Sequence, residues 1–272
     1  MATLSVDKPR TFELGHDELL NDLPMVATDI IYEGAAVGEL NDTGTYQPLN
    51  LGATTLDKFA GFAGLQADNS AGAASAVNVK VRQRGRIRLS VTGVSATTDI
   101  DKMVYATDDD TFTLTYAATA VSIGKIVRWE TGTFCIVDFE AFYLRKPITA
   151  SWSMGNGTGS YAIVDTTFFV ANQPYYVKSA SEVHAVAAGG TSDVQLVKDT
   201  TTDAPGAGTN LLTNHGNAGF DLSATANTVQ EAAFSATAGV KKLLKGDRLS
   251  LDFANAIQST TTLTVTVELV RL

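Results

Sequence analysis

The sequence predicts an all-β protein, and three observations lead to this prediction. Short apolar runs of strand length follow one another between Ile30 and Phe142, with turn residues between them. The run from Leu263 to Leu269 alternates strictly between apolar and polar residues, which is the period of a strand with one buried face. Only 18% of the 272 residues are charged, against an average of about 25%. A chain of this length is long enough for two sheet-built domains.

Residues 1–24 differ from the rest of the chain, because acidic side chains are scattered there among Pro9, Gly15 and Pro24 without a sustained period. We expect an extended N-terminal arm with little core of its own, in which residues 17–23 have the pattern of a single helical turn. Two alternatives are open: a disordered tail, or an arm that becomes ordered on a partner by pairing with an exposed sheet edge. The segment lacks the apolar stretch of a signal peptide, and no run approaches the ~20 residues of a membrane span. We therefore expect a soluble protein that is made in the cytoplasm.

Residues 25–145 are expected to form a small β-barrel domain. Asp108, Asp109 and Asp110 mark a hairpin-like turn between two short apolar runs. Together with Asp99 and Asp101 they suggest calcium, but the Asp-x-Asp-x-Asp-Gly spacing and a closing Glu are missing, which favours a solvated turn. The predicted strands cover residues 30–38, 59–64, 77–91, 102–106 and 123–129.

The predicted strand over residues 77–91 carries an unusual row of charge. Every even position from Lys80 to Arg88 is basic, and apolar residues occupy most odd positions. In a regular strand five cations therefore share one face, and their mutual repulsion requires acidic side chains nearby. Three interpretations are open: a solvated face paired with the protein's own carboxylates, a contact with another subunit or a shell, and a phosphate contact, which the lack of interleaved aromatic residues disfavours. The five cations are Lys80, Arg82, Arg84, Arg86 and Arg88.

A linker is predicted over residues 146–160, because Pro147 stops strand pairing and the run from Gly155 to Gly159 favours no single conformation. These glycines do not fit a phosphate cradle, since a strand and not a helix N-terminus is expected after them. Residues 161–272 are expected to form a second all-β domain, a β-sandwich of the jelly-roll kind. Its predicted strands cover residues 161–164, 175–177, 182–186, 194–197, 228–234, 248–253 and 263–269.

Residues that carry catalytic chemistry are few and dispersed. No Gly-x-Ser-x-Gly elbow occurs, and the lone Cys135 has the apolar neighbours of a buried side chain. The three histidines lack the spacing of a zinc site, and a net charge of −9 disfavours nucleic-acid binding. We therefore expect no enzyme, no metal and no other cofactor. The histidines are His16, His184 and His215.

Five segments, taken in order, resemble the head-decoration (capsid cement) proteins of tailed bacteriophages. The resemblance covers roughly residues 24–142, about half of the chain, and depends on the order of the segments more than on any one of them. The second half has no counterpart in simple members of the family and is similar to sandwich domains appended to phage surface proteins. The five segments are Ile31–Gly38, Phe59–Ala63, Arg82–Leu89, Lys102–Ala106 and Ile123–Arg128.

The resemblance implies a β-tulip-like barrel and a homotrimer at threefold or quasi-threefold positions on the outside of the mature head, where it stabilises the capsid. Its partners would be the major capsid protein and other copies of the chain, with no nucleic acid and no membrane. Its location would be the virion, after assembly in the host cytoplasm. We expect Leu4, Val6 and Phe12 of the arm, and the cations from Lys80 to Arg88, to bind the partner.

An alternative function is a phage surface spike, or a carbohydrate- or receptor-binding module. Aromatic side chains of the C-terminal domain would then stack on host-surface glycans, although such side chains more often pack in a core or an interface. The candidates are Trp152, Tyr161, Tyr175 and Tyr176.

Overall fold

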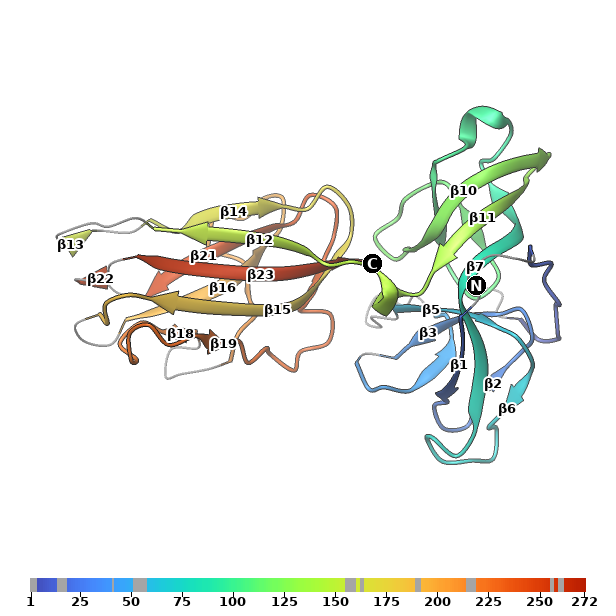
Figure 1. Ribbon diagram of the computed structural model, residues 1–272, viewed down its shortest axis with the longest axis horizontal. Helices are drawn as coiled ribbons and strands as arrows, with labels where there is room; N and C mark the ends of the chain where they lie inside the picture. Colours follow the sequence, from blue (N-terminus) through green and yellow to red (C-terminus); the bar gives the residue numbers. More distant parts are fainter. Residues whose placement is uncertain are drawn as a thin grey trace. The chain divides into compact units, whose positions relative to one another are not determined.

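The computed structural model describes residues 4–13, 19–40, 42–50, 58–154, 160–161, 164–188, 192–213, 219–254, 257–258 and 262–272. The chain divides into two compact units: unit 1 comprises Met1–Arg145 with Leu272, and unit 2 comprises Lys146–Arg271. Both are built from β-strands (Figure 1), and the described residues include two short 3-10 helices but no α-helix. The prediction of an all-β protein is confirmed. No helix in the described ranges is long and apolar enough to cross a membrane.

Nine strands of unit 1 form one sheet around a closed barrel. The sheet has the order β11-β10-β8-β9-β7-β5-β3-β4, with β1 also paired to β7. Because β11 pairs with β7 as well, the strands β7, β9, β8, β10 and β11 close on themselves. The elements are β1 (Leu19–Pro24), β2 (Ile30–Ile31), β3 (Ala36–Glu39), β4 (Tyr46–Pro48), β5 (Lys58–Ala63), β6 (Ala67–Asp68), β7 (Asn78–Thr92), the 3-10 helix η1 (Thr97–Asp99), β8 (Met103–Ala106), β9 (Phe112–Thr113), β10 (Val121–Thr131), β11 (Phe134–Glu140) and the 3-10 helix η2 (Phe142–Leu144).

Strand β7 is 15 residues long and contributes side chains to two separate apolar clusters of unit 1. Val79 and Val81 lie in one cluster, with Met25. Ile87 and Leu89 lie in the other, which fills the closed barrel. Buried residues alternate along β7 with the half-buried or exposed cations, as the sequence predicts. A fixed period of two places the two kinds of side chain on opposite faces of the strand.

Phe62 lies at the centre of the aromatic core of the barrel. Its ring is 5.0 Å from the ring of Phe139, 5.4 Å from that of Phe59 and 5.9 Å from that of Phe112, measured between centroids. The preceding Gly61 has φ +130°, and a Cβ there would lie 2.0 Å from the carbonyl oxygen of Arg82. Only glycine allows β5 and β7 to approach so closely at this point.

Unit 2 is a sandwich of two sheets around one apolar core. One sheet has the order β12-β23-β15-β19, with β20 on β15, and the other has the order β14-β21-β16-β17, with β18 on β16. Side chains from both sheets enter the same apolar cluster, which identifies a sandwich. The strands are β12 (Ile148–Ser153), β13 (Ser160–Tyr161), β14 (Thr166–Val170), β15 (Tyr175–His184), β16 (Asp193–Asp199), β17 (Thr209–Asn210), β18 (Phe220–Asp221), β19 (Gln230–Glu231), β20 (Lys242–Leu243), β21 (Arg248–Ala254), β22 (Ile257–Gln258) and β23 (Leu263–Arg271).

Several predicted elements differ from the structure. The predicted strands over residues 175–177 and 182–186 fall in the single strand β15, which ends at His184, and of residues 228–234 only Gln230–Glu231 form a strand. Residues 19–24, part of the predicted arm, form the strand β1 on β7 and no helical turn. Residues 148–153, part of the predicted linker, form the strand β12 on β23, and the glycines at 155–159 lie outside the described residues. The predicted strand over residues 30–38 is interrupted at Gly34, whose φ of +80° makes a turn between β2 and β3. The strands β1 and β12 pair with strands that lie far away in the sequence, and the turn between β2 and β3 is marked only by Gly34.

Candidate interaction surface on strand β7

The N-terminal strap, which we define as residues 4–13, lies on unit 1 of its own chain. The backbone N–H of Arg88 donates to Thr11 O at 2.9 Å, and that of Glu13 donates to Arg86 O at 3.0 Å, so the strap adds a short stretch of pairing to β7. The N–H of Lys8 donates to Glu33 O at 2.9 Å. The prediction that these residues form an arm with little core of its own is therefore corrected, because the strap is ordered by contacts within its own chain.

The strap is anchored to the turn of three aspartates between β8 and β9. The Leu4 N–H donates to Asp109 Oδ2 at 3.1 Å, Lys8 Nζ lies 2.7 Å from Asp110 Oδ2, and Arg10 also pairs with Asp110. Asp108 accepts the N–H groups of the following turn. In the part of the chain that the structure describes, no group of three His, Cys, Asp or Glu residues is arranged to hold a metal ion. The acidic turn thus acts as the docking point of the strap.

Burial raises the pKa of the Asp109 carboxyl to about 6, and the neighbouring charges of Asp108 and Asp110 add to this effect. The Leu4 N–H acts in the opposite direction but does not offset the desolvation. In an unfolded chain an aspartate has a pKa near 3.9. Folded unit 1 therefore takes up most of a proton between pH 7 and pH 5 that the unfolded chain does not bind.

Unit 1 should therefore gain stability, by about 1 kcal/mol, as the pH falls from 7 to 5, because preferential proton uptake favours the folded state. Asp109→Asn should remove this part of the pH dependence, since the amide does not titrate. The measurement is urea denaturation of both proteins at pH 7 and pH 5. Asp101→Asn is the matched control, because the Asp101 side chain is 80% exposed. An unchanged pH dependence in Asp109→Asn would contradict the assignment.

The C-terminal part of the basic row forms an ion-pair network with carboxylates of its own chain. Glu13 of the strap lies 3.9 Å from Arg86 and 2.5 Å from Arg128. Glu130 lies 2.6 Å from Arg88 and 3.4 Å from Arg128. The acidic counterpart that the sequence requires is thus present, on β10 and on the strap. These pairs support the interpretation of a face balanced by the protein's own carboxylates for this half of the row.

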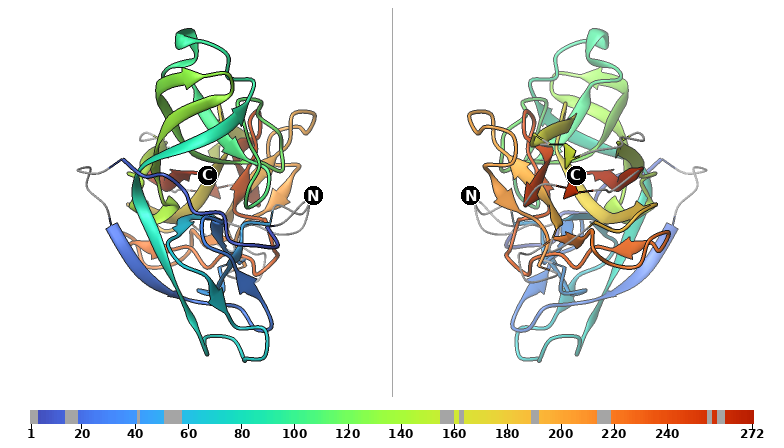
Figure 2. Two further views of the ribbon diagram at one scale, coloured as in Figure 1. Left: turned by 90° about the vertical axis from the view of Figure 1, so that its right-hand side faces the viewer. Right: turned by 90° about the vertical axis from the view of Figure 1, so that its left-hand side faces the viewer.

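The N-terminal part of the row has a different environment, next to β1. The register places Leu20 opposite Arg82 and Asp22 opposite Lys80, while Leu19 and, from β11, Glu140 lie opposite Arg84. Leu19 and Leu20 are 40% and 51% exposed. Figure 2 shows β1, in blue, beside the long strand β7. This part of the surface combines apolar and cationic side chains, a mixture that is common in protein interfaces.

The predicted partner-binding residues of the arm occupy three different environments. Leu4 packs against the apolar cluster of Val79 and Val81. Phe12 packs against the barrel core, with its ring 6.2 Å from that of Phe139 and the Arg82 guanidinium 4.5 Å from its centroid. Val6 is 66% exposed. The structure thus brings Phe12 to the basic row and leaves Val6 at the surface.

Sequence reasoning missed the two leucines of β1 and the two glutamates that pair with the row. The strand β1 is largely exposed, so its sequence does not need a period of two. Its apolar residues are Leu19, Leu20 and Leu23, which do not alternate with polar ones. Glu13 and Glu130 are separated from the basic row by more than forty positions, so only the folded pairing brings them close. No local pattern identifies either set.

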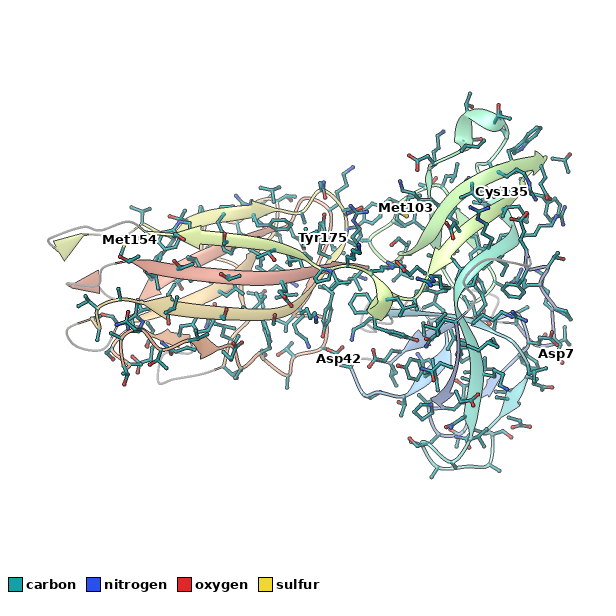
Figure 3. The ribbon with its side chains drawn as sticks, viewed as in Figure 1. Asp7, Asp42, Met103, Cys135, Met154 and Tyr175 are labelled. Atoms are coloured by element: carbon teal, nitrogen blue, oxygen red, sulfur yellow. The ribbon has the colours of Figure 1, made fainter. Side chains whose placement is uncertain are left out.

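The residues considered for zinc or thiol chemistry have structural roles where they are described. His184 is fully buried in unit 2, with Nδ1 2.9 Å from Glu182 Oε1 and Nε2 3.1 Å from Ala224 O. Burial raises the pKa of Glu182, and Gln230 donates to its other oxygen at 2.7 Å. Cys135, labelled in Figure 3, is buried on β11, which raises its pKa to about 11. His16 and His215 lie outside the described residues.

The aromatic residues considered for glycan stacking are largely internal. Tyr175 and Tyr176 are 4% and 5% exposed. Trp152 packs against the sandwich core, 5.6 Å from the ring of Phe253. Tyr161 lies in the short strand β13. Two of the four rings are therefore too buried to stack on a sugar in this fold.

No protein-family model and no curated protein sequence matches this chain. Two solved structures show a weak similarity, each with 10% sequence identity, a TM-score of 0.27 and coverage of 97% of this chain. One is of T=1 particles derived from infectious bursal virus, of whose chain 71% is covered, and the other is of the Gx strain of infectious bursal disease virus, of whose chain 73% is covered. TM-scores of this size do not establish a common fold.

Proposed function

We propose that this protein is a virion structural protein that binds the outer surface of a tailed-phage capsid as a homotrimer and stabilises the mature head. One observation carries the proposal. The five segments that resemble head-decoration proteins do not scatter in the fold: they contribute β3, β5, β7, β8 and β10, which are all strands of the nine-stranded sheet of unit 1. The resemblance implies that these segments belong to one β domain, and three of them contribute the closed barrel strands β7, β8 and β10.

The proposed mechanism is adhesion and not catalysis. A rigid barrel that contacts two or more coat subunits at once would oppose their separation under the pressure of packaged DNA. In a trimer, three copies of a modest contact act together, because the second and third contacts form at a high effective concentration. The proposed partners are the major capsid protein and other copies of the chain, and the proposed location is the capsid surface after assembly in the host cytoplasm.

The test is a binding experiment with undecorated phage heads in their expanded and unexpanded forms. The purified protein should bind expanded heads, saturate in multiples of three copies, and raise the temperature at which the heads release their DNA. Binding to neither form, or no gain in head stability, would contradict the proposal.

Val6 offers a probe of the strap that should not disturb the fold, because its side chain is 66% exposed. If the strap contacts the coat protein, Val6→Asp should weaken attachment about tenfold or more, since it places a charge in an interface. Val229→Asp is the matched control, because Val229 is 58% exposed and lies in unit 2. Equal binding by the two variants would exclude Val6 from the contact.

A further inference from the structure

We propose that two copies of this protein pair through strand β12 of unit 2, antiparallel and across a twofold axis, so that the sheet β12-β23-β15-β19 continues from one copy into the next. A twofold contact uses the same surface on both copies. The inference goes beyond the proposed attachment to heads and does not depend on it. The contact is separate from the one that holds the proposed homotrimer together, and on a head it would join one trimer to the next.

Strand β12 offers a row of backbone groups that point away from its own sheet. It is the end strand of the sheet and pairs with β23 (Figure 1). In the same register the Met154 N–H donates to Leu263 O at 2.8 Å. Because the backbone groups of successive residues alternate between the two edges of a strand, those of Thr149, Ser151 and Ser153 point outward. All three residues are exposed, and no strand of the described ranges pairs with this edge.

The other end strands of the sheets have features that oppose pairing with a second chain. Strand β4 has three residues and ends at Pro48, which has no N–H to donate, and β17 and β19 have two residues each. Strand β14 is interrupted by a bulge between Thr167 and Phe169. Short length, proline and bulges all protect natural sheet edges. Strand β12 has six residues in an uninterrupted register and contains no proline, glycine or charged side chain.

The sequence of β12 is complementary to itself when two copies run antiparallel. A twofold axis at Ser151 aligns this residue with Ser151 of the second copy, and Thr149 with Ser153. All three outward-pointing residues of each copy then lie in hydrogen-bonded pairs, which together exchange about six N–H···O bonds. The same register places the large Trp152 opposite the small Ala150, so their side chains do not compete for space.

A shift of this register is less favourable. Moving the strands by two residues in one direction brings Pro147, which has no N–H, into the ladder, and moving them in the other direction extends the ladder past the end of β12. Either shift therefore loses hydrogen bonds. The register centred on Ser151 is the one that uses every outward-pointing group of the strand.

Apolar area and charge also favour a second copy as the occupant. Ala150 and Trp152 are only partly buried against the sandwich core, and Ile148 is 37% exposed. A further strand beside β12 would cover part of this apolar surface. Each copy has a net charge of −9, but β12 carries none of it, so no like charges lie opposite each other in the pair. Backbone hydrogen bonds supply the affinity and side-chain pairs supply the register.

A charge at the twofold axis provides the first test, in sedimentation velocity of the full-length protein. The wild type should form larger species as its concentration rises, by the joining of two smaller assemblies. Ser151→Lys should weaken this association at least tenfold, because it places two ammonium groups opposite each other. Ser181→Lys is the matched control and should associate like the wild type. Ser181 and Ser151 lie in one row across Thr266, about 10 Å apart at the usual strand spacing.

Ser151→Pro is an uncharged variant for the same measurement. It removes one outward N–H and leaves the hydrogen bonds between β12 and β23 in place, as proline does at the open edge of a sheet. Association should be lost while the melting temperature stays that of the wild type.

A disulfide at the twofold axis provides the second test. Hydrogen-bonded residues of an antiparallel pair have Cα atoms about 5.5 Å apart, a distance that a disulfide spans. Oxidised glutathione should therefore convert Ser151→Cys into a disulfide-linked dimer and leave Ser181→Cys unlinked. The natural Cys135 is buried and does not compete.

Equal sedimentation of the wild type and a folded Ser151→Lys, or equal yields of linked dimer from the two cysteine variants, would overturn the inference. Head attachment is scored separately. A wild type that pairs through β12 but ignores heads would refute the proposed function alone, and one that binds heads without this pairing would refute the inference alone.

Discussion

Phe62→Ala should destabilise unit 1 by about 3–5 kcal/mol, because it removes a fully buried ring and leaves a cavity in a packed core. Phe62 contacts three other aromatic rings edge-on or tilted, with centroid distances of 5.0 to 5.9 Å. Such pairs add to the free energy of burial. A small domain has a total stability of only about 5–15 kcal/mol, so most of it should be lost. The measurement is urea denaturation monitored by circular dichroism.

The matched control is Phe134→Ala on the β10–β11 hairpin. This ring is 38% exposed, with the Arg88 guanidinium 4.1 Å from its centroid. Its removal should cost roughly 1 kcal/mol or less, the order of a partly exposed cation–π contact and partial burial. Similar costs for the two substitutions would mean that the aromatic core does not hold unit 1 together.

Removal of residues 1–24 should have the second large effect. The free energy of unfolding of unit 1 should fall by about 4–6 kcal/mol, because several buried side chains are lost together. The deletion removes β1, including Leu23, which is 6% exposed. It also removes the half-buried side chains of Phe12 and Leu4, which pack against the two apolar clusters. An arm with little core of its own would instead leave stability unchanged. Differential scanning calorimetry should show the transition of unit 1 at a much lower temperature or not at all.

The transition of unit 2 serves as the internal control in the same scan, because unit 2 has its own apolar core. Val6→Ser should leave both transitions in place, as expected for a side chain that is 66% exposed. A deletion variant that melts like the wild type would restore the interpretation of residues 1–24 as an independent arm. The deletion is also a poor probe of head attachment, since any loss of binding would follow from unfolding.

The strands with one fully buried face were predicted well from the sequence. In β7 and β23 the buried positions alternate with exposed or half-buried ones. A period of two is a local property, so it is visible before folding. Two of the strands that were missed, β1 and β12, are mostly exposed. Their existence depends on the edges of β7 and β23, which are distant in the sequence.

The candidate site was predicted in part. The basic row from Lys80 to Arg88 and its common face were evident from residue types and spacing. The sequence left open what faces the row, and the structure gives two answers. Glu13 and Glu130 neutralise the end near Arg88, while exposed leucines of β1 accompany the end near Lys80.

The sequence by itself determined the class of fold, the central strand and its charge, because these follow from side-chain periodicity along a single stretch of chain. Only the tertiary structure decided that the first residues fold onto their own barrel, and that a glutamate of the strap and one of β10 share Arg128. The physical reason is that pairing between strands is non-local. The backbone N–H and C=O groups of a strand can form hydrogen bonds with any strand edge that lies beside it, and no pattern within one strand specifies which edge that is.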